Sequence, residues 1–322
     1  MVIEKWSARI KQFQRIGQIV PIEPQPKNKD FNHCKRIIKI LIRNKINRRG
    51  CLIAVGGGYV GDMVGFIAAT YMRGIDFMQI PTTLMAMGDP VIGKVAIDFS
   101  GFKNLLGAFY SPVYTFCDFN YLETLKSEEI VLGLAEVWKS ALVINNKSMI
   151  DQINKLLESD CYDLKKLSLL AERSIKTKKR FVEADWNDKK GRHKALSLGH
   201  TFSNYFESRF KIRHGEGVCC GIVLAAILSR ELEEIGVRKL NEIIKTYKLF
   251  NLRLSALKKI QRKINTVDLI TKLNFDKINT VKGQYQFVVL TIDGFCVKVS
   301  VPRRIIEKVI FKFKKLMLVP YN

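Results

Sequence analysis

The spacing of apolar residues changes near residue 125, and the change divides the chain into two predicted regions. Before it, short apolar runs alternate with stretches of helical spacing. Cys51 to Val55 is a short apolar run that ends in glycines, which is typical of a buried strand, and residues 77–81 and 113–118 resemble it. Residues 32–46 carry apolar side chains at helical spacing, with Asn32 as a candidate cap. This alternation predicts an α/β domain.

Two further segments of the first region have weaker patterns. Residues 1–22 predict a short amphipathic helix followed by a strand over 18–22. Residues 88–104, GDPVIGKVAIDFSGFKN, contain glycines and a proline among polar groups and are expected to form a loop. Polar side chains on such a loop, beside a nucleotide fold, suit a phosphate or sugar site.

After residue 125 the apolar spacing is mostly helical. Helices are expected over residues 128–144, 147–158, 163–184, 201–208, the run after His214, 237–249 and 303–316. Asp293-Gly294 lies between two alternating runs and predicts a hairpin. We therefore expect a Rossmann-like α/β nucleotide-binding domain over residues 1–124 and a mostly α-helical metal-binding domain over residues 125–322.

Composition and charge fit an ordinary globular protein. The chain has 322 residues, of which 47% are hydrophobic, and a formal net charge of +24. The basic residues are spread along the chain. This distribution favours a lysine-rich surface over nucleic-acid binding as the reason for the high net charge. A cleft for a phosphorylated anion would use part of this charge.

The seven cysteines form no CxxC pair, which indicates reduced thiols. The N-terminus has no apolar signal-peptide core, and the apolar run after His214 is too short to span a bilayer. These features predict a cytoplasmic protein that does not bind membranes.

Three glycines follow the first buried strand. Gly56, Gly58 and Gly61 satisfy the GxGxxG pattern between a strand and a helix. Amides at the start of such a helix can bind a pyrophosphate. A tight turn that needs glycine only for steric reasons is the alternative.

Two of the four histidines lie within Leu196–Val218, each beside a glycine. His200, Asn204 and Glu207 are spaced so that one face of a helix carries all three. His200 and His214 at the edge of a buried helix suggest a metal site or an acid–base site. Two ordinary histidines, one capping a helix and one satisfied in the core, are the alternative.

Glu136 and Lys139 lie three residues apart in an apolar helix. A buried carboxylate needs a partner, which is either a lysine or a metal. The spacing by itself favours the salt bridge.

Several motifs occur together in one order along the chain. They are GGGYVGDMVGF, ATYMRG, IPTTLMA, GK, KNLLGAFYSP, GLAEVWK, GHTF and HGEGV. Together they resemble the 3-dehydroquinate synthase family of sugar-phosphate cyclases over roughly residues 23–300.

The resemblance implies roles for individual residues. Zn²⁺, with Co²⁺ as an alternative, would be held by Glu136, His200 and His214. NAD would be bound by Gly57, Gly58, Asp62, Thr82, Thr83, Lys103 and Thr124. Substrate or catalytic contacts would come from Arg73, Asp89, Lys94, Asn104, Lys139, Lys178, Arg192, Asn204 and Lys277. In this family Arg73 would serve a neighbouring subunit, so a homodimer is implied.

The activity implied is that of a carbon–oxygen lyase acting on a phosphorylated sugar acid or sugar phosphate. One ring alcohol is transiently oxidised, phosphate is eliminated, the hydride is returned and an aldol closure makes a carbocycle, as in the shikimate pathway. Zinc would act as a Lewis acid in this chemistry. A related class, the glycerol dehydrogenase-like enzymes, would catalyse a net oxidation instead.

The chain departs from the family pattern near the expected substrate. Asp89 to Lys94 is one residue short, and the interval from His200 to His214 about two. Ser197 stands where dehydroquinate-forming members have Asn, and Asn204 where the family has a second His. His193 stands where an Arg is expected, with Arg192 adjacent. These changes motivate a second expectation, a cyclase for another sugar phosphate of the heptulose 7-phosphate type. The family's opening strand, with its acidic adenosine-binding residue, is also expected to be missing.

Overall fold

The computed structural model divides the chain into two compact units, Met1–Leu125 and Lys126–Asn322, here the N-terminal and C-terminal units. The residues it describes are 2–4, 17–23, 29–88, 93–100, 102–184, 192–254, 260, 263–273, 285–298 and 301–316.

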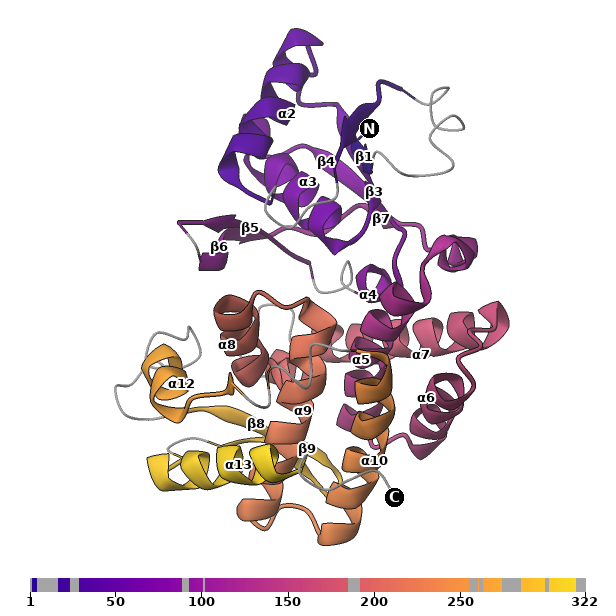
Figure 1. Cartoon of the computed structure of the whole chain (residues 1–322). Helices are drawn as coiled ribbons and strands as arrows, with labels where there is room; N and C mark the ends of the chain where they lie inside the picture. The colour runs from indigo at the N-terminus through magenta and orange to yellow at the C-terminus, as the bar shows by residue number, and fades with distance from the viewer. Residues whose placement is uncertain are drawn as a thin grey trace. The chain divides into compact units, whose positions relative to one another are not determined.

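A parallel sheet forms the centre of the N-terminal unit (Figure 1). In sheet order its strands are β2 (Val20–Ile22), β1 (Val2–Glu4), β3 (Cys51–Gly56), β4 (Asp76–Pro81) and β7 (Tyr114–Thr115). Every neighbouring pair is parallel. The expected strands at 51–55, 77–81 and 113–118 are confirmed, the last as a shorter strand.

Helices and short 3₁₀ turns complete this unit. They are α2 (Phe31–Arg43), α3 (Gly58–Thr70), η2 (Tyr71–Arg73), α4 (Leu84–Met87) and η4 (Phe119–Thr124). Helix α3 packs on β3 and β4 and buries Val60, Met63, Val64 and Ile67 completely. The small and apolar residues of α3 let it pack closely on these strands. This packing holds the glycine turn, which directly precedes α3, at the end of β3.

The expected loop over residues 88–104 is wrong in its second half. Lys94–Phe99 is strand β5, and it pairs antiparallel with β6 (Phe102–Phe109). Val95 and Ile97 are buried, whereas Ala96 and Asp98, which alternate with them, are partly exposed. This alternation is the period of a strand with one buried face. The flanking glycines made the segment resemble a loop in the sequence.

The start of the chain also differs from expectation. Val2–Glu4 is a strand rather than part of a helix, and it pairs with both β2 and β3. Helix α2 is capped by Asp30, not by Asn32. The Asp30 carboxylate accepts the backbone N–H of His33 at 2.9 Å, which leaves Asn32 inside the first turn.

The C-terminal unit is mostly helical. It contains α5 (Ser127–Val143), α6 (Lys147–Ser159), α7 (Leu164–Glu183), η5 (Arg192–Ser197), α8 (His200–Phe210), α9 (His214–Glu231), α10 (Val237–Arg253), α12 (Thr266–Leu273) and α13 (Arg303–Lys315). A hairpin of β8 (Phe287–Thr291) and β9 (Gly294–Lys298) joins them. The expected helices and hairpin are confirmed, and α12 is additional.

Two helices form the core of this unit. Every residue of Ile130–Val143 in α5 and of Gly215–Ser229 in α9 is buried. Figure 1 shows α9 among α5, α8, α10, α13 and β8, and it packs against all five. A helix that is buried on every side lies at the centre of a domain. The charged side chains within these two stretches of α5 and α9 are therefore enclosed by protein.

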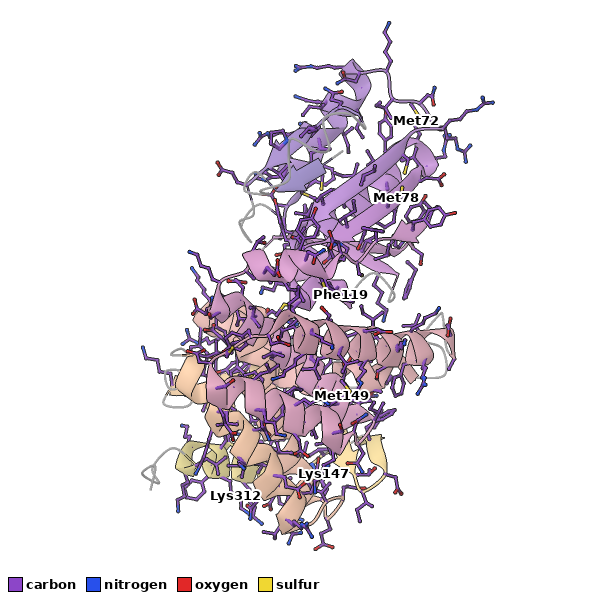
Figure 2. All side chains as sticks on the ribbon, turned by 90° about the vertical axis from the view of Figure 1, so that its right-hand side faces the viewer. Met72, Met78, Phe119, Lys147, Met149 and Lys312 are labelled. Atoms are coloured by element: carbon purple, nitrogen blue, oxygen red, sulfur yellow. The ribbon has the colours of Figure 1, made fainter. Side chains whose placement is uncertain are left out.

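The outer elements close this core. Met149 of α6, labelled in Figure 2, is fully buried. Lys312 of α13, also labelled there, and Lys308 bind the carboxylate of Glu231 at the end of α9. Within the described part of the chain, none of the helices has the length and apolar character needed to cross a membrane.

Candidate metal centre and nucleotide pocket

Three helices of the C-terminal unit bring the candidate ligands together. Glu136 lies within α5, and His200 and His214 are the first residues of α8 and α9. One suitable atom from each of the three residues lies within 4.8 Å of the other two. The three metal ligands expected from the sequence are therefore brought together within the C-terminal unit.

Glycines permit the close packing that places these ligands. A Cβ at Gly215 would lie 2.5 Å from the carbonyl oxygen of Leu132 in α5. A Cβ at Gly221 would lie 2.1 Å from the carbonyl oxygen of Gly199, whose backbone has φ +78°. The start of α9 thus touches α5, and the start of α8 touches α9. Larger residues would separate the helices that hold the histidines.

The two oxygens of Glu136 face different partners. Oε2 lies 2.8 Å from Nζ of Lys139 and 3.2 Å from Nζ of Lys178. Oε1 lies 3.6 Å from Nε2 of His200 and 3.4 Å from Nε2 of His214. The salt bridge expected from the spacing is present, and the cluster with the histidines exists beside it.

A metal fits this cluster. Glu136 Oε1 is buried, and within the described part of the chain it has no hydrogen-bond partner. A buried acceptor without a partner costs about 1–3 kcal/mol. Two imidazole nitrogens and a carboxylate oxygen that lie close together form a typical donor set for catalytic zinc.

The charges around the cluster explain its protonation. Burial raises the pKa of Glu136, but Lys139 and Lys178 outweigh it and hold the pKa well below its usual value. Burial and then Lys139 lower the pKa of His200, which keeps that imidazole neutral. Burial also lowers the pKa of His214, but Glu207 and Glu136 outweigh it and raise the pKa overall.

The expected substrate residues of this unit differ in their positions. Lys139 and Lys178 are buried beside Glu136. Asn204 is exposed on α8. Arg192 begins η5, but its side chain, like all of Lys277, lies outside the described residues.

The N-terminal unit contains a pocket at the carboxyl ends of β3 and β4. Gly57, Gly58, Asp62 and Lys94 are among the residues that line it. Gly57 caps α3 and Gly58 is the first residue of that helix. The glycine turn thus lines a pocket at a helix N-terminus, where amides favour anions.

The other expected cofactor residues lie outside the described lining of this pocket. Thr82 follows β4, and its backbone N–H donates to Gly56 at 3.0 Å. Thr83 caps α4 through Ala86. Thr124 ends η4 and donates to the Tyr121 carbonyl at 2.7 Å, and Lys103 is exposed on β6.

Lys29 is a pocket-side residue that the sequence did not suggest. Its ammonium group donates to Asp62 and to Asn104, an expected cofactor residue and an expected substrate residue. No motif marks Lys29, because its partners are far away in sequence. Arg73 is exposed in η2 with φ +64°. Asp89 lies outside the described residues.

These features define a two-domain protein with a nucleotide-type pocket in one unit and a candidate metal centre in the other. Residues 19–132 match the family described as 3-dehydroquinate synthase N-terminal, and residues 133–279 match 3-dehydroquinate synthase C-terminal. The chain belongs to the 3-dehydroquinate synthase family.

Curated relatives agree with this family. The chain is 39% identical to the 3-dehydroquinate synthase of Staphylococcus epidermidis over 239 residues, which are 73% of this chain and 66% of the relative. It is 37% identical to that of Sulfurisphaera tokodaii over 285 residues, 86% of this chain and 79% of the relative. The chain thus spans just under two thirds of the Staphylococcus enzyme.

Solved structures share the fold. One is 2-epi-5-epi-valiolone synthase from Streptomyces hygroscopicus with NAD⁺ and Zn²⁺ bound, with a TM-score of 0.84 at 22% identity over 98% of this chain and 90% of that one. Another is 2-deoxy-scyllo-inosose synthase, at 0.82 and 22% over 97% and 89%. A probable glycerol dehydrogenase from Sinorhizobium meliloti gives 0.66 at 10% over 99% and 91%.

Proposed function

We propose that this chain is a zinc- and NAD-dependent sugar-phosphate cyclase, a 3-dehydroquinate synthase of the shikimate pathway. It would convert a phosphorylated sugar acid into a carbocycle in the cytoplasm. It would act as a homodimer, with the exposed Arg73 serving the neighbouring subunit. Family membership and the relatives' activity support the reaction class.

The observation that carries the proposal is the position of Glu136 Oε1, a buried oxygen that makes no hydrogen bond among the described residues. It faces two imidazole nitrogens, while the second oxygen is occupied by two lysines. A purely structural salt bridge would not require the histidines to converge on the free oxygen. A cation held there would satisfy all three donors.

The residues around this cluster suit an anionic substrate. Glu136, His200 and His214 would hold Zn²⁺ or Co²⁺, and the residues of the glycine pocket would hold NAD. When bound, the metal supplies Lewis acidity toward a substrate hydroxyl, and NAD supplies a reversible hydride acceptor. Lys139 and Lys178 keep Glu136 ionised and add positive charge beside it, which favours phosphate or carboxylate. Overall the substrate loses phosphate and closes a ring without net oxidation.

The remaining assignments are part of the same proposal. Cofactor contacts would come from Gly57, Gly58, Asp62, Thr82, Thr83, Lys103 and Thr124. Substrate contacts would come from Arg73, Asp89, Lys94, Asn104, Lys139, Lys178, Arg192, Asn204 and Lys277.

A second candidate is a cyclase for a different sugar phosphate, of the heptulose 7-phosphate type. Ser197 and Asn204, which replace the residues expected of dehydroquinate-forming members, favour it. A glycerol dehydrogenase-like oxidoreductase is a third candidate, since that fold is related.

Product assays separate the three candidates. Purified protein is incubated with NAD, Zn²⁺ and either the phosphorylated sugar acid precursor of 3-dehydroquinate or a heptulose 7-phosphate. We expect phosphate release from the sugar acid, without net NADH. Release only from the heptulose phosphate would reject the dehydroquinate assignment, and net NADH with a simple polyol would reject both cyclases.

A further inference from the structure

We propose that Glu207 is a positioning residue for the metal centre, which fixes the ring orientation and tautomer of His214 so that Nε2 faces the cation. The inference rests on the proposed function in one respect: it takes Glu136, His200 and His214 to hold a divalent cation. It adds a residue that does not itself touch the metal.

A hydrogen-bonded chain leads from α8 to the metal face of His214. Ser203 Oγ donates to Glu207 Oε1 at 2.9 Å, and Nδ1 of His214 lies 2.8 Å from the same oxygen. The other ring nitrogen, Nε2, lies 3.4 Å from Glu136 Oε1. The imidazole is therefore held at one nitrogen while the second points at the cluster.

The direction of these hydrogen bonds determines the tautomer. An ionised carboxylate can only accept, so the proton shared by Glu207 and His214 must lie on Nδ1. In the neutral imidazole this leaves the lone pair on Nε2, where a metal would bind. A carboxylate behind a histidine ligand also makes the ligand more basic.

Burial makes the arrangement specific. The Glu207 side chain is 5% exposed, whereas that of His214 is 35% exposed at the start of α9. The Ser203 hydroxyl donates to the same carboxylate oxygen that receives His214. The more accessible imidazole is thus anchored to a carboxylate that the protein encloses.

A glycine permits the helix contact that forms this chain. A Cβ at Gly217 of α9 would lie 2.4 Å from Ser203 Oγ and 3.3 Å from Glu207 Cγ. Any larger residue would push α8 away from the start of α9. One face of α8 therefore supplies a ligand, His200, and two turns later the support for the other ligand, His214.

Glu207→Gln tests the proposal with little change in shape. The Gln amide can donate to Nδ1 and select the tautomer whose proton lies on Nε2. We measure Zn²⁺ affinity by chelator competition and the visible absorption of the Co²⁺-loaded protein. We expect Zn²⁺ affinity to fall by about 10–100-fold, with a changed Co²⁺ spectrum. Ser203→Ala should shift affinity in the same direction by less.

Glu231→Gln is the matched control. Glu231 is also a carboxylate whose side chain is little exposed, at 7%, and it lies at the other end of α9 from His214. It should change neither Zn²⁺ affinity nor the Co²⁺ spectrum. A folded Glu207→Gln protein with wild-type affinity and spectrum would overturn the proposal. If that variant does not fold, Glu207→Asp, which withdraws the carboxylate by one methylene, is judged by the same two measurements.

The wild type and Glu136→Ala separate this inference from the proposed function. Zn²⁺ binding that is absent in the wild type, or equally tight in Glu136→Ala, would reject the metal centre itself. Binding that depends on Glu136 but not on Glu207 would reject only the role of Glu207.

Discussion

The two units build their candidate sites from different parts of the chain. Five of the fourteen residues that line the pocket of the N-terminal unit are glycines, and Gly57, Gly58 and Gly61 among them lie at the start of α3. The centre of the C-terminal unit consists of buried side chains, with Glu136 between two lysines and two histidines. The first site depends on glycines, which have no side chain to fill the pocket. The second depends on charged side chains that the protein encloses.

This difference predicts how each site fails. A glycine-lined pocket should be disrupted by adding atoms and should tolerate changes of charge nearby. A buried charge cluster should be disrupted by removing one partner, because the remaining charge is left without compensation. Variants can therefore be chosen to affect one site and spare the other.

The largest expected effect is that of Lys178→Met. Removing this buried cation leaves Glu136 with Lys139 alone, and breaking a buried pair typically costs about 3–5 kcal/mol. Urea denaturation should show this loss in EDTA-treated protein and a smaller loss in Zn²⁺-loaded protein, because the metal would compensate Glu136. Equal losses in both states would contradict a metal at Glu136.

Lys176→Met provides the control for that variant. Lys176 lies two residues away on α7, and its ion pair with Glu172 is exposed to solvent. The denaturation midpoint should stay unchanged, since exposed pairs contribute little.

The next effect is that of Gly61→Leu in the N-terminal unit. A Cβ there would already lie 3.2 Å from the Gln79 amide, so a leucine must displace this side chain, which also lines the pocket. We expect NAD affinity, measured by calorimetry, to fall by more than about tenfold, or ~1.4 kcal/mol. Zn²⁺ affinity should not change. Gly17→Leu is the control, because Gly17 has open space around it; equal NAD affinity in both variants would reject the pocket.

A smaller effect is expected for Asp62→Asn. This change removes the ion pair with Lys29 and the carboxylate proposed to bind NAD. Asp62 is 30% exposed, so solvent screens the pair and the free energy of unfolding should change by no more than about 1 kcal/mol. NAD affinity should fall several-fold. Asp76→Asn, at the opposite end of β4, should leave it unchanged, and the same result for Asp62→Asn would remove that residue from the site.

The last prediction concerns thiol chemistry and leaves both sites intact. Burial, and then Asp30, raise the pKa of Cys34 to about 12, whereas Cys161 is exposed. The thiolate is the reactive form, so iodoacetamide at pH 8 should label Cys161 at least about a hundredfold faster than Cys34. Mass spectrometry of the peptides measures both rates. Similar rates would mean that the Cys34 side chain of α2 is not buried in the N-terminal unit.

The sequence predicted the helical unit more fully than the α/β unit. Long periodic helices such as α5 and α7 have strong local signals, whereas β5 is short and lies beside glycines that resemble a loop. The cap of α2 depends on one hydrogen bond that Asp30 accepts from the backbone N–H of His33, and neighbouring Asn32 is an equally good capping residue by type.

The candidate ligands could be predicted only partly. The spacing placed His200 and Glu207 on one face, but it could not show that Glu207 contacts His214. The sequence left two alternatives for Glu136, a salt bridge or a metal. In the structure one carboxylate oxygen faces two lysines and the other faces two histidines. Lys29 could not be found, because its contacts with Asp62 and Asn104 depend on the tertiary fold.

The most direct test of the account is the metal content of wild-type protein and of Glu136→Ala after loading with Zn²⁺ and desalting. Plasma mass spectrometry should find close to one zinc per chain in the wild type and almost none in the variant, with both proteins folded by circular dichroism. Equal zinc in both proteins, or none in the wild type, would contradict a metal centre at Glu136, His200 and His214.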